Sequence, residues 1–382
     1  MTSDRYNIVI LGLSVTSSWG NGHATTYRGL MRGLAEMGHD VLFLECNKPW
    51  YEKNRDLPRP PYGRTELYNS LTELQDRFDA TIRMADAVIV GSYVPDGIAV
   101  GEWVLRTARG VRAFYDIDTP VTLAAVSNGN RCEYLHRSQI PAYDLYLSFT
   151  GGPVIKRLER EFGSPAARVL YCSVDPDRYT PHAQKPVWDI GYLGTYSADR
   201  QASLEELLLQ TARARASDRY VVAGSLYPDS ISWPHNVERI EHLAPADHPS
   251  FYNAQKFTLN LTRSAMIWAG YSPSVRLFEA AACGVPIISD YWKGLNEILC
   301  IGSEVLLARD RSDISRILRD TSEEQRQAIG MRARQRILRA HTFRIRALQL
   351  TAHLTEQMNR LARTASRGTV TSVGVPAMNY GS

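Results

Sequence analysis

Short apolar runs alternate with amphipathic segments along most of the chain, and this pattern predicts its fold class. In the first half, buried strands are predicted at 7–15, 41–45, 87–91, 111–115, 145–149 and 169–172, with helices at 25–37 and 67–84. Strands joined through helices of this length run parallel, because each helix carries the chain back to the same end of the sheet. Residues 1–180 are therefore predicted to form a doubly wound α/β domain.

The same pattern resumes after a linker predicted at 181–188. Strands are then predicted at 190–194, 220–224, 237–243, 257–261 and 285–289, and helices at 204–215, 250–254, 275–282, 313–318 and 323–340. This order predicts a second doubly wound domain over residues 188–342. A long amphipathic helix is predicted at 343–363, and residues 364–382, which have little to bury, are predicted to form a mobile tail.

Composition narrows the class of protein. A chain of 382 residues with 44% hydrophobic and 22% charged residues is typical of a soluble protein of two domains. The net charge of +4, without a dense block of Lys and Arg, argues against nucleic acid as a partner. Five cysteines without metal-type spacing favour reduced thiols in the cytoplasm, and no cofactor or metal is expected. The apolar run Ile8 to Val15 is too short for a membrane span.

The stretch from Tyr271 to Asp290 carries the strongest chemical signal. Ser272 is predicted to cap a helix whose first turn holds Pro273, and the free N–H groups of such a helix start can seat a phosphate. Glu279 lies about 7.5 Å along the helix axis from Ser274, at roughly 1.5 Å per residue. A carboxylate at that distance from a diphosphate can accept hydrogen bonds from both ribose hydroxyls. The alternative is a surface ion pair between Glu279 and Arg276.

A glycine-containing loop follows the first strand and invites comparison with a dinucleotide-binding fingerprint, since Glu45 follows at a suitable distance. Its glycines are Gly20 and Gly22, but Thr25 stands where the third glycine would be. The loop also runs several residues past the strand before its first glycine, whereas a dinucleotide loop turns at once. A nicotinamide oxidoreductase is therefore disfavoured.

Two carboxylates follow the strand at 111–115. Residues at the carboxyl ends of parallel strands point into the ligand crevice, and Asp116 and Asp118 would lie on one side if the strand continued. Either could act as a base or orient an acceptor hydroxyl. The alternative is that Asp118 or Thr119 only caps the following helix.

The segment RLFEAAACGVPIISD, from Arg276 to Asp290, resembles the nucleotide-sugar site of group 1 glycosyltransferases with the GT-B fold. Within that family it is most similar to the spore-maturation (CgeB-like) group, in which an Arg-x-Phe-Glu-Ala run opens this helix. The resemblance extends to the order of elements from about residue 188 to 310. It implies two Rossmann-like domains facing across a cleft, with the helix at 343–363 crossing back to the first. It also implies transfer of a hexosyl group from a uridine- or thymidine-type nucleotide-diphospho-sugar to an acceptor hydroxyl.

The resemblance also implies the residues of the donor site. The family holds the diphosphate with a Gly-Arg pair and a later Lys; here Thr195 replaces that Arg, and Arg200 falls at the later basic position. A second glutamate that touches the sugar in the family is replaced by Tyr271, so the donor sugar is not implied. The expected donor-binding residues are Gly194, Thr195, Arg200, Arg263, Tyr271, Ser272, Ser274, Arg276 and Glu279.

On the acceptor side, the resemblance implies that the loop containing Gly20 and Gly22 faces the cleft. His23 would then be a base or a sugar ligand, although a solvent-exposed loop histidine is the alternative. An inverting enzyme would need a base among His23, Asp116 and Asp118, whereas a retaining one would not. Metal-independent transfer is expected. The alternatives are metal-dependent transfer through Asp116 and Asp118, a nucleotide-sugar epimerase and a non-catalytic nucleotide-sugar binder. The acceptor and the oligomeric state are not specified by these residues.

Overall fold

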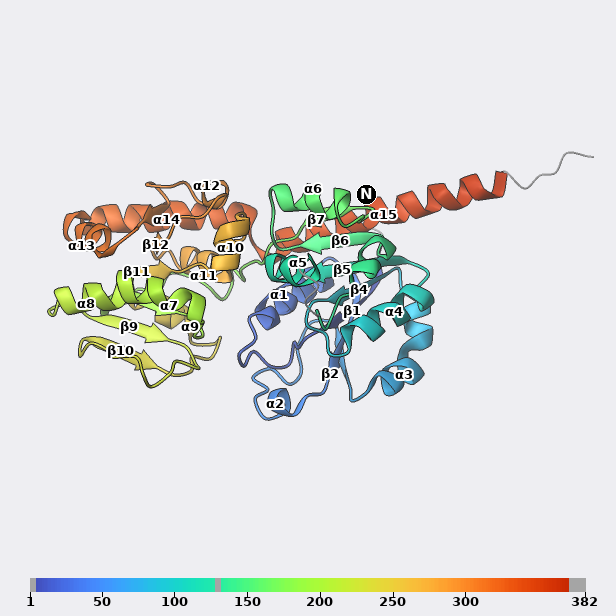
Figure 1. Cartoon of the computed structure of the whole chain (residues 1–382), viewed down its shortest axis with the longest axis horizontal. Helices are drawn as coiled ribbons and strands as arrows, with labels where there is room; N and C mark the ends of the chain where they lie inside the picture. Colours follow the sequence, from blue (N-terminus) through green and yellow to red (C-terminus); the bar gives the residue numbers. More distant parts are fainter. Residues whose placement is uncertain (1–4, 128–131, 371–382) are drawn as a thin grey trace, which may run out of the picture.

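The computed structural model describes residues 5–127 and 132–370, which form two α/β domains side by side (Figure 1). The first contains a seven-stranded sheet in the order β3-β2-β1-β4-β5-β6-β7, and the second a six-stranded sheet in the order β10-β9-β8-β11-β12-β13. Every strand pair registered in the described residues is parallel. The predicted fold class, two doubly wound parallel domains, is confirmed.

The elements of the first domain, in chain order, are β1 (Asn7–Gly12), α1 (His23–Glu36), β2 (Asp40–Cys46), α2 (Pro49–Glu52), β3 (Arg64–Tyr68), α3 (Leu71–Met84), β4 (Ala87–Gly91), α4 (Gly97–Thr107), β5 (Val111–Asp116), α5 (Thr119–Ser127), a 3-10 turn (Arg137–Ala142), β6 (Leu145–Ser148), α6 (Pro153–Arg160) and β7 (Ala167–Val169). Three predicted boundaries are wrong by three or more residues. The strand predicted at 169–172 is β7, which ends at Val169. Strand β1 ends at Gly12, not at residue 15. The helix predicted from 67 begins at Leu71, because Ser70 caps it by accepting a hydrogen bond from the Glu73 amide.

The elements of the second domain are β8 (Trp188–Leu193), α7 (Ala198–Leu204) with a π-helical turn (Glu205–Leu209) leading into α8 (Gln210–Ala214), β9 (Tyr220–Ala223), β10 (Val237–Ile240), α9 (His248–Asn253), β11 (Gln255–Asn260), α10 (Ser264–Ala269), α11 (Val275–Ala282), β12 (Ile287–Ser289), α12 (Leu295–Ile298), β13 (Val305–Leu307), α13 (Arg311–Asp320) and α14 (Glu323–Ala340). The sequence pattern did not predict α10, α12 or β13, all of which are short.

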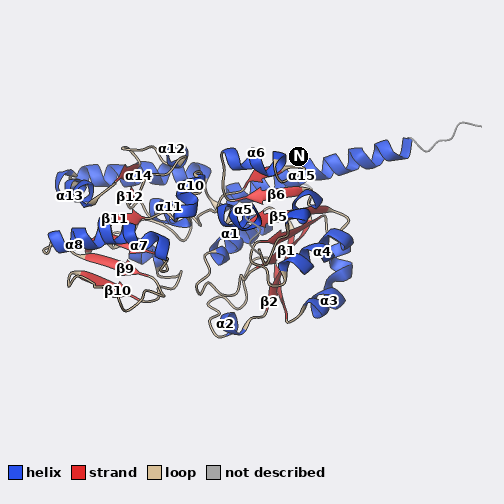
Figure 2. Ribbon diagram, viewed as in Figure 1, coloured by secondary structure: helices blue, strands red, loops and turns tan. Residues whose placement is uncertain are grey.

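Helices lie on both sides of each sheet (Figure 2), and this arrangement explains why the central strands are apolar, whereas the edge strands β3 and β10 carry charged residues. In β1, Val9 and Leu11 pack into one core, while Ile8 and Ile10 pack into another on the opposite face. None of the helices in the described part of the chain combines the length and apolar character that a membrane span requires.

The last helix, α15 (Phe343–Val370), leaves the second domain and lies along the first (Figure 1). It packs closely on α1, where a Cβ added to Gly33 would lie 2.7 Å from that of Ala347. The helix predicted to end at 363 thus runs seven residues further, and the first part of the predicted mobile tail is helical. The rest of that predicted tail, 371–382, lies outside the described residues.

Candidate active site

A cleft of about 590 Å³ opens between the carboxyl ends of the two sheets, and both domains line it. The first domain contributes the loops that follow β1, β4, β5, β6 and β7. The second contributes the loops that follow β8, β9, β10 and β11, together with the start of α11. Most of the predicted site residues line this cleft: Gly20, Gly22, His23, Asp118, Gly194, Thr195, Arg200, Arg263, Ser272, Ser274, Arg276 and Glu279. Asp116 and Tyr271 are not among the lining residues.

The start of α11 is open toward the cleft. The helix begins at Val275 with Ser274 as its N-cap, so the predicted cap at Ser272 is wrong. The Ser274 hydroxyl donates to Asn260 Oδ1 at 2.8 Å, and no side chain caps the helix. An uncapped helix start keeps its amide groups and its positive dipole end available for an anion. Ser272 donates to the Gly270 carbonyl and contacts the Thr150 hydroxyl of the other domain at 2.8 Å.

Three arginines of the second domain line the same part of the cleft, and none pairs with a carboxylate among the described residues. Arg276 is 7% exposed and donates to the Leu193 carbonyl at 2.6 Å and to Asn260 Oδ1 at 2.9 Å. The predicted alternative of a surface pair with Glu279 is therefore wrong. Arg200 donates to the Thr195 carbonyl at 2.6 Å, while its Nε and that of Arg263 are buried without a partner. Burial and the nearby charge of Arg276 lower the pKa of Arg200.

Gly194 has a steric role in this group. A Cβ added to it would lie 2.9 Å from the Arg276 guanidinium and 2.7 Å from the Tyr192 hydroxyl, so a side chain there would displace the arginine. Arg276 also lies over the Tyr192 ring, 4.8 Å from its centroid. The glycine and the aromatic ring together fix the direction in which the guanidinium faces the cleft.

Glu279 is buried on α11, and its carboxylate still borders the cleft. It accepts hydrogen bonds from the Tyr179 hydroxyl at 2.8 Å and the Tyr252 hydroxyl at 2.9 Å, and His248 Nδ1 lies 3.7 Å away. Burial acts to raise the pKa of Glu279, but His248 and the two hydroxyl donors outweigh it and hold that pKa below its ordinary value. The carboxylate is thus ionised and oriented. Sequence reasoning missed these three partners: His248 and Tyr252 lie on α9, and Tyr179 lies in the segment that leaves the first domain.

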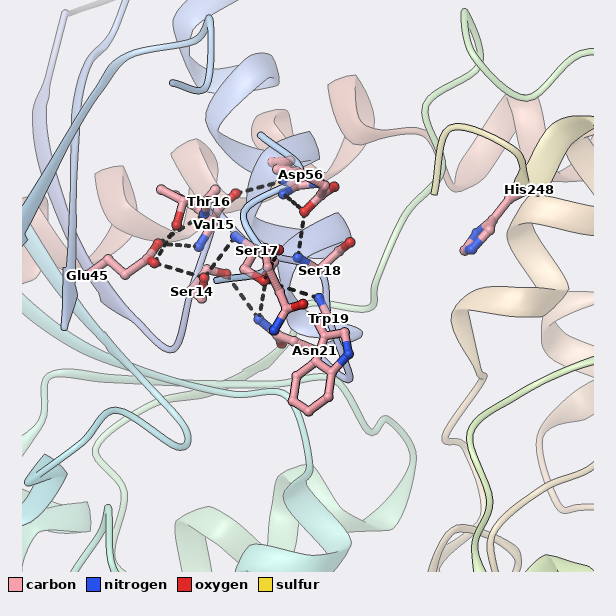
Figure 3. A network of polar contacts seen from close by, with 12 residues as sticks. Ser14, Val15, Thr16, Ser17, Ser18, Trp19, Asn21, Glu45, Asp56 and His248 are labelled. Atoms are coloured by element: carbon pink, nitrogen blue, oxygen red, sulfur yellow. Dashed lines mark hydrogen bonds and ion pairs between the residues drawn. The ribbon is translucent and has the colours of Figure 1, made fainter. Parts of the chain in front are cut away.

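The glycine loop of the first domain is held from behind by Glu45 (Figure 3). The buried Glu45 carboxylate accepts hydrogen bonds from the Ser14 hydroxyl and from the Val15 and Thr16 amides at 2.9, 2.7 and 3.0 Å. All its described partners belong to the loop, so it is not free to bind a ribose. This arrangement argues against the dinucleotide comparison. A second anchor is Asp56, which accepts from the Ser18 amide at 2.7 Å and pairs with Arg28 at 2.8 Å.

His23 and Asp118 face each other across the first-domain wall of the cleft. His23 Nε2 lies 3.9 Å from Asp118 Oδ2, and His23 Nδ1 is buried without a hydrogen-bond partner. Tyr93, which the sequence did not suggest, lines the cleft beside them, with its ring centroid 5.4 Å from that of His23. Its φ of 64° is unusual for a residue other than glycine, and such strained conformations cluster at functional sites.

Asp116 does not reach the cleft. Strand β5 ends at this residue, so the prediction that Asp116 and Asp118 lie on one side of a continuing strand is wrong. The fully buried Asp116 carboxylate accepts from the Tyr146 hydroxyl at 2.6 Å, the Thr122 hydroxyl at 2.9 Å and the Asp118 amide at 3.1 Å. Burial raises the pKa of Asp116 to about 6 despite these donors. Asp116 shapes the turn that carries Asp118, and it is not a base at the acceptor.

Tyr271 joins the domains and does not face the cleft. Its carbonyl accepts from the Gly151 amide at 2.9 Å, and its φ is 52°. The ring lies against Gly152 and Gly294, where added Cβ atoms would approach it to 2.3 and 2.5 Å. The residue predicted to stand at a sugar-contacting position is therefore an interdomain contact in this structure.

Comparison with known structures identifies the fold to which this two-domain architecture belongs. Sucrose-phosphate synthase from Thermosynechococcus elongatus aligns with a TM-score of 0.69 at 16% identity, over 93% of this chain and 100% of that one. Anabaena Alr3699/HepE, solved with UDP and glucose, aligns with a TM-score of 0.66 at 13% identity, over 92% and 100%. The chain has the GT-B fold. A Listeria monocytogenes protein assigned as a UDP-N-acetylglucosamine 2-epimerase shares this GT-B fold, with a TM-score of 0.57 at 12% identity, over 92% and 96%.

Sequence comparison adds a family match in the second GT-B domain. Residues 200–352 match the family described as glycosyl transferase-like. This region contains Arg200, Arg263, Arg276 and Glu279, which line the cleft. No curated protein sequence matches the chain.

The raised pKa of Asp116 predicts a pH dependence of stability. The folded state holds this proton up to about pH 6, whereas the carboxyl ordinarily releases it near 3.8, so its contribution to the free energy of unfolding falls as the pH rises through that interval. The loss amounts to about 3 kcal/mol. Asp116→Asn cannot ionise and should not show it.

We expect the thermal unfolding midpoint of the parent, relative to that of Asp116→Asn, to fall as the pH is raised from about 3.5 to about 7, a range that spans the interval of about 3.8 to 6. Asp229→Asn, on an exposed loop, is the matched control and should follow the parent. A parent-to-variant difference that stays constant with pH would contradict the assigned role of burial.

Proposed function

We propose that this protein is a glycosyltransferase that moves a hexosyl group from a nucleotide-diphospho-sugar to an acceptor hydroxyl. The observation that carries the proposal is the group formed by Arg200, Arg263 and Arg276, which lack carboxylate partners among the described residues, at the uncapped start of α11. Such a group suits a diphosphate. The family match over residues 200–352 and the UDP and glucose bound to HepE support the same conclusion.

Glu279 supplies the second half of donor recognition. It lies one helical turn beyond the open start of α11, and its two oxygens retain acceptor capacity beyond the hydrogen bonds from Tyr179 and Tyr252. A ribose whose two hydroxyls donate to this carboxylate would leave the diphosphate at the helix start. We further propose a uridine or thymidine base, a cytoplasmic location and a place in the CgeB-like group.

The transfer itself needs positioning and charge stabilisation. The acceptor oxygen attacks the anomeric carbon as the bond from that carbon to the diphosphate oxygen breaks, and the nucleoside diphosphate leaves with the electron pair. The arginines and the α11 amides stabilise the leaving charge. If configuration is inverted, the acceptor proton passes to the His23–Asp118 pair. If it is retained, the departing phosphate oxygen accepts the proton.

The proposed function can be tested by comparing ligands that carry phosphate charge with one that does not. Arg200→Ala should weaken binding of UDP and of inorganic pyrophosphate by about 1.5–3 kcal/mol each, because both present phosphate charge to the guanidinium. Binding of uridine, which has no phosphate, should be unchanged. Isothermal titration calorimetry with these three ligands provides the measurement. Arg213→Ala is the control, since Arg213 pairs with Glu205 away from the cleft. Equal losses for uridine and UDP would show that Arg200 acts only through structure.

The ribose role of Glu279 predicts the complementary pattern. Glu279→Gln should weaken UDP and uridine binding by about 1.5–3 kcal/mol and leave pyrophosphate binding unchanged, because only the first two ligands contain ribose. Gln is preferred to Ala, which would leave the buried hydroxyls of Tyr179 and Tyr252 without their acceptor. A variant that binds UDP as tightly as the parent would refute the role.

We also propose that transfer requires no metal ion. The alternative needs Asp116 and Asp118 as joint ligands, but the Asp116 carboxylate is enclosed by Tyr146 and Thr122 outside the cleft lining. We therefore expect the release of UDP from a UDP-sugar to persist unchanged in excess EDTA. Loss of activity on chelation, followed by recovery with Mn²⁺, would overturn this proposal.

Epimerisation of a nucleotide sugar is the second candidate, favoured by the fold shared with the Listeria protein. The two reactions differ in their products. An epimerase changes the sugar in the absence of any acceptor, whereas a glycosyltransferase releases free nucleoside diphosphate as the sugar moves to a hydroxyl or to water. Anion-exchange chromatography of a UDP-sugar incubated with the protein separates the two outcomes.

A further inference from the structure

The two walls of the cleft differ in charge, and this difference bears on the acceptor. All arginines among the described lining residues, Arg200, Arg263 and Arg276, belong to the second domain. The part of the first domain that the structure describes contributes no Lys or Arg to the lining. Its ionisable side chains there are His23, Tyr93, Asp118 and Cys172, and its remaining lining residues are uncharged.

Two arginines lie behind the glycine loop, but both are engaged. Arg28 donates to Asp56 through both terminal nitrogens, at 2.8 and 3.0 Å, and its Nε donates to the Val15 carbonyl at 2.8 Å. Arg55 donates to the Thr16 hydroxyl at 3.1 Å and to Asn47. Neither is a lining residue of the cleft. Their hydrogen bonds stabilise the loop and leave its cleft side without a cation.

We propose that the acceptor group entering this cleft is an uncharged saccharide or polyol and that the first-domain wall excludes phosphorylated acceptors. A phosphate there would face Asp118 without a Lys or Arg partner from the described first-domain lining, and a desolvated anion without such a partner is unfavourable. The diphosphate of the donor, by contrast, has three guanidiniums on the other wall. The inference rests on the proposed transferase function and specifies its acceptor.

Trp19 lies at the edge of this wall, although it is not itself among the residues that line the cleft. Its side chain is 41% exposed, and its two neighbours, Ser18 and Gly20, line the cleft. In Figure 3 the indole projects from the loop away from the Glu45 network. An exposed indole on a loop fixed by that many hydrogen bonds is a pre-ordered platform for the apolar face of a sugar ring. We therefore assign to Trp19 the role of positioning the sugar ring of the acceptor.

The charge part of the proposal is tested with the donor site filled. Inorganic phosphate and glucose 6-phosphate are titrated into the protein by calorimetry, first alone and then at saturating UDP. We expect both to bind the free protein at the arginine wall and to show no measurable binding once UDP is present. Binding of glucose 6-phosphate to the UDP-saturated protein as tightly as to the free protein would overturn the proposal. Failure of UDP itself to bind would instead count against the proposed function.

The platform is tested by saturation-transfer NMR with maltose as a neutral probe on the UDP-saturated protein. Trp19→Ala should lose most of the transfer to maltose, and Trp19→Phe should retain part of it. Trp50→Ala is the matched control, since Trp50 is 51% exposed but neither it nor its neighbours line the cleft; it should behave as the parent does. UDP titration checks that each variant is folded. Absence of transfer in the parent, or equal signals in Trp19→Ala and the parent, would overturn the assignment.

Discussion

The crossing of the chain between its two domains fixes the geometry on which the cleft depends. The Val174 amide donates to the His341 carbonyl at 3.0 Å, and the Phe343 amide donates to Val174 at 3.1 Å, so the outgoing and returning segments are joined. Arg346, 3% exposed, donates to the Tyr171, Cys172 and Ala340 carbonyls. These carbonyl oxygens, the Gln349 side chain and His341 Nδ1 satisfy the buried guanidinium, and no carboxylate in the described part of the chain pairs with it. The joined segments hold the carboxyl ends of both sheets toward one cleft.

Within the second domain, the side chain at the start of α11 that could cap the helix instead bonds to a neighbouring strand. Ser274 could cap the helix, but its hydroxyl donates to Asn260, which also accepts from Arg276. Asn260 in turn donates to the Ser289 hydroxyl at 2.9 Å, which ties β11 to β12. The helix start is thus fixed in place while the Val275 and Arg276 amides stay uncovered; the Leu277 amide donates to the Ser274 carbonyl. A cap of the usual kind would stabilise the helix by about 1 kcal/mol and block the anion position.

The sequence predicted those features that follow from local periodicity and failed where distant contacts decide. The helix at 275–282 and the central strands follow from apolar patterning, and Glu279 lies on that helix as expected, while its ribose role stays a prediction. Asp116 was misplaced because Tyr146 and Thr122, which bind its carboxylate, draw the chain into a turn. Tyr271 was misplaced for a related reason: its contacts, Gly151 and Gly152, lie in the other domain. No pattern near either residue reveals these partners.

The two walls of the cleft illustrate two ways of preparing a site. In the first domain, the carboxylates of Glu45 and Asp56 accept hydrogen bonds from backbone amides of the glycine loop. These bonds fix the conformation of the loop before any ligand binds. In the second, Arg200 and Arg263 retain unpartnered nitrogens and α11 keeps its first amides uncovered. Such groups are costly to bury alone and become favourable only beside an anion. A rigid wall without Lys or Arg among its described lining residues therefore faces a wall with three arginines. The donor should contribute most of the binding affinity, while the shape of the first-domain wall selects the acceptor.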